Sequence, residues 1–136
     1  MNRDVSPETF ECAAIAENLA SARSFLRRYL AAAQWDGRDL DVVIAVGEVL
    51  QNVVRHGFAG GNPRGKIHME VSVEQGTLLV VVEDNAPPSV PSGWSSSGRP
   101  AKNGGLGLNI IRRIAADVEF APTATGNHAR LRFHPD

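Results

Sequence analysis

The sequence predicts an α+β fold of two layers, with a largely antiparallel sheet on one side and helices on the other. Two observations support this prediction. Helical and strand-like periodicities follow one another in the order strand, helix, helix, strand, strand, long loop, helix, strand, strand. The chain has 136 residues, which is the size of one ordinary domain with its own core. We therefore expect a single domain over residues 1–136.

The first part of the chain predicts one strand and two helices. ETFECAAI (8–15) is short and alternates loosely, which predicts a strand. From Glu17 to about Ala33, apolar residues recur at helical spacing, with arginines on the opposite side. QWDGRD breaks this pattern, and a second helix is expected from Asp39 to His56, with Gly57 as its C-cap.

The middle of the chain predicts a β-hairpin. In KIHMEVSVE (66–74) apolar and polar residues alternate with period two, which is typical of a strand buried on one side. Gln75-Gly76 supplies a tight turn. TLLVVVED (77–84) is a continuous apolar run, which favours a central strand.

The last part predicts a long loop, a third helix and two strands. Residues 85–103 are rich in Pro, Gly and Ser, and a loop of this length in a compact domain is usually functional or disordered. The third helix is expected from Leu106 to about Asp117. The final strands are expected at 118–122 and 128–134, around the turn TATGN.

Composition excludes several classes of protein. The formal net charge is −1, so no basic excess indicates nucleic acid as a partner. The single cysteine, Cys12, allows no internal disulfide, and a reducing compartment fits this count. No run of 18 apolar residues and no signal-peptide core occur. We expect a cytoplasmic protein that binds neither nucleic acid nor membrane.

A polar stripe on the second helix is the first candidate for chemistry. Glu48, Asn52 and His56 stand at i, i+4 and i+8, so they share one face of an ideal helix, opposite the valines. A solvated face is the usual explanation of such a stripe. The residue types favour function instead, because carboxylate, carboxamide and imidazole groups transfer protons or bind metals. The small residues Ala45 and Gly47 leave room beside them.

A glycine-rich segment before the third helix is the second candidate. Gly104, Gly105 and Gly107 stand where free N–H groups and the positive end of the helix dipole favour phosphate. The segment is neither a dinucleotide fingerprint nor a P-loop, because GLGLNI does not follow a first strand and no GK[ST] is present. The alternative is that the glycines only turn the chain and allow close packing.

Asp84, the last residue of the apolar strand, is the third candidate. A carboxylate at a strand end can accept a hydrogen bond from an exocyclic amine such as that of adenine. The alternative is an ordinary aspartate that starts a turn.

Together these three segments resemble the nucleotide-site motifs of the GHKL-type ATPases, which include histidine kinases, DNA gyrase B, MutL and heat-shock chaperones. AVGEVLQNVVRHGF, VVEDNAPP and GGLGLNIIRRIAADVEF are most similar to the free-standing branch of anti-sigma factor serine/threonine kinases. The resemblance spans about residues 8–134. It implies a two-layer sandwich with a mixed, mostly antiparallel sheet and three helices on one face.

The resemblance also implies roles for individual residues. Glu48 is similar to the general base that takes the proton of an attacking hydroxyl, and Asn52 to the ligand of Mg²⁺ beside the ATP phosphates. Asp84 is similar to the adenine contact, with Ala86 in the same loop, and residues 85–103 to a lid over ATP. The other cofactor-binding candidates are Arg55 and His56 at the edge of the site, Lys102 in the lid, and Gly104, Gly105, Leu106, Gly107 and Leu108 in the glycine box.

Two positions depart from the family pattern. Ala86 stands where relatives have glycine two residues after the aspartate, and Asn103 stands where many carry another glycine. A methyl group at position 86 is expected to crowd the purine or to oppose a positive φ, whereas asparagine tolerates left-handed backbone. Because Glu48 and Asn52 are both present, we expect nucleotide binding to be retained.

The function implied by the resemblance is a cytoplasmic kinase that uses ATP and Mg²⁺ to phosphorylate a small anti-anti-sigma antagonist protein on serine or threonine. Its implied partners are that antagonist, a sigma factor or an analogous regulator, and a second copy of the chain in a homodimer. Two alternatives stay open: a non-catalytic ATP-binding module of the same fold, and a detached catalytic domain of a histidine kinase.

Overall fold

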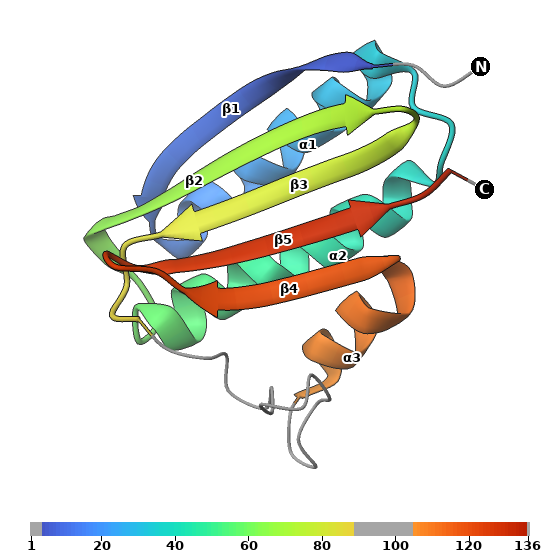
Figure 1. The fold of residues 1–136 in the computed structure, drawn as a ribbon. Helices are drawn as coiled ribbons and strands as arrows, with labels where there is room; N and C mark the ends of the chain where they lie inside the picture. Colours follow the sequence, from blue (N-terminus) through green and yellow to red (C-terminus); the bar gives the residue numbers. More distant parts are fainter. Residues whose placement is uncertain (1–3, 89–104, 136) are drawn as a thin grey trace.

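The computed structural model describes residues 4–88 and 105–135. A five-stranded sheet forms one layer, and three helices lie on one of its faces (Figure 1). The strands are β1 (Val5–Ala14), β2 (Asn62–Glu74), β3 (Thr77–Asp84), β4 (Asp117–Pro122) and β5 (Asn127–Phe133). The helices are α1 (Leu19–Ala33), α2 (Asp39–Asn52) and α3 (Gly105–Ile114). This confirms the predicted α+β fold and its element order.

The sheet has the order β1-β2-β3-β5-β4, and its four pairings are all antiparallel. The expected mixed sheet is therefore wholly antiparallel. Two helices, α1 and α2, connect β1 to β2 and return the chain in the opposite direction. The single helix α3 makes β4 run parallel to β3, but β5 lies between them, so no parallel pair forms.

The core lies between the sheet and the helices. Alternate residues of β2 and β3 point toward the helices, as the period-two pattern predicts. β3 is the central strand, in agreement with its continuous apolar sequence. The largest side chains that are fully buried come from both layers and include Leu26, Leu30, Leu50, Met69, Ile111 and Leu131.

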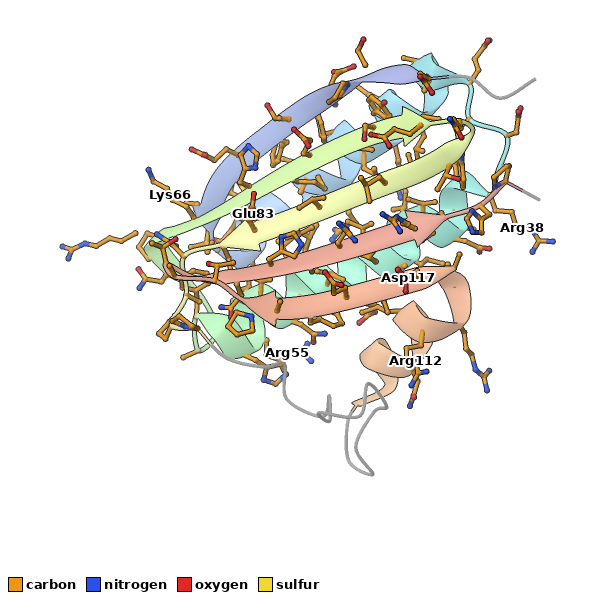
Figure 2. All side chains as sticks on the ribbon, in the orientation of Figure 1. Arg38, Arg55, Lys66, Glu83, Arg112 and Asp117 are labelled. Atoms are coloured by element: carbon orange, nitrogen blue, oxygen red, sulfur yellow. The ribbon has the colours of Figure 1, made fainter. Side chains whose placement is uncertain are left out.

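The opposite face of the sheet carries no helix and is turned toward the viewer in Figures 1 and 2. Polar residues alternate with the core residues there, and Glu83 on β3 lies on this face, with His68 4.0 Å away on β2. The Gln75-Gly76 turn joins β2 to β3 with positive φ at both residues, 51° and 81°. These angles suit the right-handed twist of a two-residue hairpin.

Several boundaries differ from the predicted ones. α3 ends at Ile114, and Asp117 is already the first residue of β4. A 3₁₀ turn, Ala16–Asn18, precedes α1. Gly57 is not a left-handed C-cap, because α2 continues into a π-helical turn, Val53–Gly57, and the positive φ angles come later, at Ala59, Gly60 and Gly61.

The direction of the elements brings three segments together at one end of the sheet. β3 ends there, α2 ends there with its π turn, and the turn from β4 to β5 lies beside the end of β3. α3 lies beside β4 and leads into the start of that strand (Figure 1). Among the described residues, no helix is long and apolar enough to span a membrane.

Two glycines give opposite stability predictions. A Cβ at Gly126, in the β4–β5 turn, would overlap the backbone carbonyl oxygen of Asp84, whereas a Cβ at Gly47 in α2 would meet, among the described residues, only Arg23 Cδ, at 3.6 Å. We expect Gly126→Ala to lower the free energy of unfolding by about 3 kcal/mol, because backbone must move. Gly47→Ala is expected to raise it by about 0.5–1 kcal/mol through helix propensity. Urea unfolding of both variants measures the difference, and equal effects would contradict the close approach at Gly126.

Candidate functional site

The α2 helix positions the two central candidates. Its valines and Leu50 are buried, so the opposite face presents Glu48 and Asn52, both half-buried and one turn apart. Within the described residues, the Glu48 carboxylate forms no hydrogen bond or ion pair. It is therefore available to accept a proton. α2 also packs against α3, the helix that the glycine box opens.

Asn52 carries a buried amide nitrogen that has no hydrogen-bond partner among the described residues. A buried polar atom without a partner costs stability, so such atoms usually have a functional explanation. A phosphate oxygen could accept from Nδ2, and rotation of the amide by 180° would instead place Oδ1 there as a hard ligand for Mg²⁺. The environment of Asn52 thus fits a magnesium-bound triphosphate.

The π-helical turn after Asn52 changes which residues continue the polar stripe. Phe58 N donates to Val53 O at 3.1 Å, an i to i+5 bond. This wider turn adds one residue, so Gly57 rather than His56 follows Asn52 on the same face. His56 and Arg55 are both exposed, and Figure 2 shows Arg55 at the end of the α2 segment, on the helical side of the sheet. The predicted three-residue stripe is therefore wrong for His56.

Ala86 lies directly against this π turn. It is fully buried, and a Cβ built on Gly57 would lie 3.3 Å from the Ala86 Cβ. Ala86 does not have a positive φ, so the expected conflict between its methyl group and the backbone does not arise. Gly57 provides the space for the methyl group.

Asp84 ends β3 on the helix-facing side of the sheet and starts a small hydrogen-bond network. Its Oδ1 accepts from Ala86 N at 2.9 Å and from Asn127 Nδ2 at 3.1 Å. Burial raises the pKa of Asp84, and the hydrogen bonds from Asn127 and Ala86 partly lower it. The other carboxylate oxygen has no protein donor among the described residues, so it is the acceptor that Asp84 can offer to a purine amino group.

Asn127 is the residue of this network that sequence reasoning missed. It stands directly opposite Asp84 in the register of β3 and β5, and Nδ2 also lies 3.4 Å from Ala86 O and 3.2 Å from Pro87 O. The only signal in the sequence is its place after Gly126 in the TATGN turn. That segment alone indicates no more than a simple connection between two strands.

The glycine box is described in part. α3 begins at Gly105, and its first turn contains Leu106, Gly107 and Leu108 in helical backbone, while their contact with phosphate stays a prediction. Lys102, Asn103 and Gly104 lie outside the described residues, as does most of the predicted lid 85–103. Among residues 4–88 and 105–135, no three His, Cys, Asp or Glu residues form a metal cluster. A cation at Asn52 would therefore need phosphate oxygens and water to complete its shell.

The comparisons with known proteins concern the family and the fold. The histidine kinase-like ATPase domain family matches residues 12–133. A search of curated proteins finds no match. Among solved structures, the RsbU and RsbW domains of Rv1364c from Mycobacterium tuberculosis have a TM-score of 0.67 and 21% identity, over 96% of this chain and 32% of that one.

Two histidine kinases are also similar in fold. The histidine kinase domain of the blue-light activated histidine kinase from Erythrobacter litoralis EL346 has a TM-score of 0.58 and 20% identity, over 88% of this chain and 60% of that one. The catalytic domain of the histidine kinase ThkA has a TM-score of 0.57 and 15% identity, over 96% and 97%. This chain thus spans about a third of the first of these structures, and all three have nearly the same fold.

The buried amide nitrogen of Asn52 has no partner among the described residues, so removing it should raise stability and weaken nucleotide binding. We expect Asn52→Leu to raise the free energy of unfolding of the ligand-free protein by about 1 kcal/mol, because a buried unpaired donor is removed. The same variant should lose magnesium-dependent nucleotide binding. Urea unfolding and calorimetric titration with ATP measure the two effects. Gln51→Leu, on the exposed side of the same turn, is the control and should change stability by less than about 0.5 kcal/mol.

The contact between Gly57 and Ala86 predicts coupled substitutions. Gly57→Ala should be neutral or destabilising in the wild-type background, since the new methyl group meets Ala86 at 3.3 Å. In an Ala86→Gly background it should stabilise by up to about 1 kcal/mol, as alanine favours helical backbone. A double-mutant cycle of unfolding free energies gives the coupling. The same effect in both backgrounds would show that the two residues do not touch.

Proposed function

Because the chain belongs to the histidine kinase-like ATPase domain family, we propose that it is an ATP-dependent protein kinase that phosphorylates serine or threonine on a small antagonist protein. The observation that carries this proposal is the pair Glu48 and Asn52 on one face of α2, whose carboxylate and buried amide nitrogen have no partner among the residues that the structure describes. The similarity in fold to a structure that contains an RsbW domain favours this branch over others.

The proposed reaction follows from the placement of these groups. Glu48 accepts the proton of the attacking hydroxyl, whose oxygen bonds to the γ-phosphorus while the bond from that phosphorus to the β,γ-bridging oxygen breaks. The products are a phosphoprotein and ADP. Magnesium bound at Asn52 would neutralise charge on the phosphates. Asp84 orients the purine, and the N–H groups at the start of α3 face the phosphates.

The proposed biological role is partner switching. The unphosphorylated antagonist binds the kinase and releases a sigma factor or an analogous regulator. Phosphorylation adds about 1.5 to 2 negative charges to the antagonist and expels it, and the kinase then captures the regulator again. A homodimer in the cytoplasm is part of the same proposal and is based on the family resemblance.

Two other functions remain as competing outcomes. A binding module of this fold would bind ATP without transfer, and the departures at Ala86 and Asn103 favour it. The contact of Ala86 with Gly57 weakens that argument, because the methyl group is accommodated without a positive φ. A histidine kinase domain would transfer phosphate to histidine, and two structural neighbours are histidine kinases.

The decisive variant is Glu48→Ala. We expect it to retain nucleotide binding and to lower the rate of label transfer from Mg-ATP to a candidate antagonist by about 10²–10⁴-fold, which is the usual contribution of a general base. The control is Glu70→Gln, an exposed carboxylate on β2, on the face of the sheet away from the helices. It should transfer at the wild-type rate.

Each competing outcome has its own signature in this assay. Transfer that survives Glu48→Ala would contradict the assigned base. An acid-labile product would indicate phosphohistidine, whereas phosphoserine and phosphothreonine survive acid. Binding without transfer in the wild type would leave the ATP-binding module.

A further inference from the structure

The junction between β3 and β5 contains a polar side chain with no assigned role in the proposed reaction. Asn127 is the first residue of β5, and its Nδ2 lies within hydrogen-bond distance of Asp84 Oδ1 and of the carbonyl oxygens of Ala86 and Pro87. One side chain thus holds both the base-binding carboxylate and the first residues of the loop that follows it.

The backbone around this asparagine is also fitted to the junction. Gly126, directly before it, lies so close to the carbonyl of Asp84 that no side chain fits. Asp84 and Asn127 are register partners in neighbouring antiparallel strands. Their separation is therefore set by the sheet, which holds the amide of Asn127 beside the carboxylate of Asp84.

We propose that Asn127 is a positioning residue that sets the nucleobase selectivity of the site. Together with Ala86 N it occupies Asp84 Oδ1, which leaves Oδ2 as the hydrogen-bond acceptor for the base. This inference rests on the proposed function to the extent that the base is a purine of a nucleoside triphosphate.

The chemistry of selectivity depends on the charge of Asp84. An ionised carboxylate accepts from the 6-amino group of adenine, but opposes the 6-oxo group of hypoxanthine, which is also an acceptor. A protonated carboxyl can donate to that oxo group, so protonation reverses the preference. Burial raises the pKa of Asp84 and thereby favours its protonated form.

Asn127 opposes the protonation of Asp84. A hydrogen bond donated to the charged form of a carboxyl favours that form, and the bond from Asn127 lowers the pKa of Asp84. Without the donor, the pKa of Asp84 should rise further. ATP binding would then weaken as the pH falls, and it would do so at a higher pH than in the wild type.

The experiment compares the affinities of ATP and inosine triphosphate between pH 5 and pH 8 for the wild type and Asn127→Ala. Inosine triphosphate is a sharper probe than guanosine triphosphate, because it replaces the 6-amino group by an oxo group without adding an amino group at position 2. We expect the preference for ATP to fall by about tenfold in Asn127→Ala, the size that follows from loss of one charge-assisted hydrogen bond. The fall should be larger at low pH.

Two further variants separate positioning from folding. Asn127→Asp keeps the shape but replaces the donor by a second carboxylate, so its loss of selectivity should exceed that of Asn127→Ala. Asn127→Thr supplies a hydroxyl donor and should restore part of the preference. Thr125→Ala, in the same turn and exposed, is the matched control and should behave as the wild type.

A readout without nucleotide completes the test. Carboxyl carbon chemical shifts of the ligand-free protein report the titration of Asp84, and its midpoint should move to higher pH in Asn127→Ala but not in Thr125→Ala. An unchanged midpoint together with an equal loss of both nucleotides would overturn the inference and leave Asn127 a purely structural role. A wild type that binds neither nucleotide would overturn the proposed function as well, which distinguishes the two failures.

Discussion

The structure depends on the burial of α2 on three sides. The helix contacts α1, α3 and the sheet, and seven of its residues are buried. Apolar residues cover those sides, so the helix cannot rotate without exposing valines to water. The remaining side therefore has a fixed direction. Glu48 and Asn52 lie on it, and their direction is a consequence of core packing rather than of contacts within the site.

The π-helical turn at the end of α2 changes which residues lie on the same face as Asn52. A regular α-helix would have carried His56 onto the face of Asn52, with Gly57 turned away. The π-helical turn instead brings the one residue without a side chain against the loop that follows Asp84. As a result, the turn that follows Asn52 lies against the loop that follows Asp84, with the buried side chain of Ala86 between them.

Much of the fold could be predicted because the spacing of apolar residues along the chain reflects which side chains are buried. The alternation in 66–74 and the apolar run in 77–84 specify a half-buried strand and a central strand regardless of what lies around them. Glu48, Asn52 and Asp84 could be proposed because their motif lies within short segments. The π turn could not, since VVRHG has no composition that separates it from an α-helix. Asn127 could not either, because its importance comes from a register partner 43 residues away in sequence. The insertion of β5 between β3 and β4 is equally a long-range pairing that local patterns do not record.

The two unsatisfied groups of the site have different physical consequences. The carboxylate of Glu48, which has no partner in the part of the chain that the structure describes, costs little, because it is half-buried and water can solvate it. The amide nitrogen of Asn52 is sealed from solvent and has no partner among the described residues, so it costs stability in every ligand-free molecule. Selection for stability alone would favour an apolar side chain at that position, as at the neighbouring positions of the same helix. A polar side chain there is understandable if a ligand supplies the missing partner. A ligand that pairs with this amide removes its cost to stability. Through Asn52, occupancy of the site therefore raises the stability of the fold.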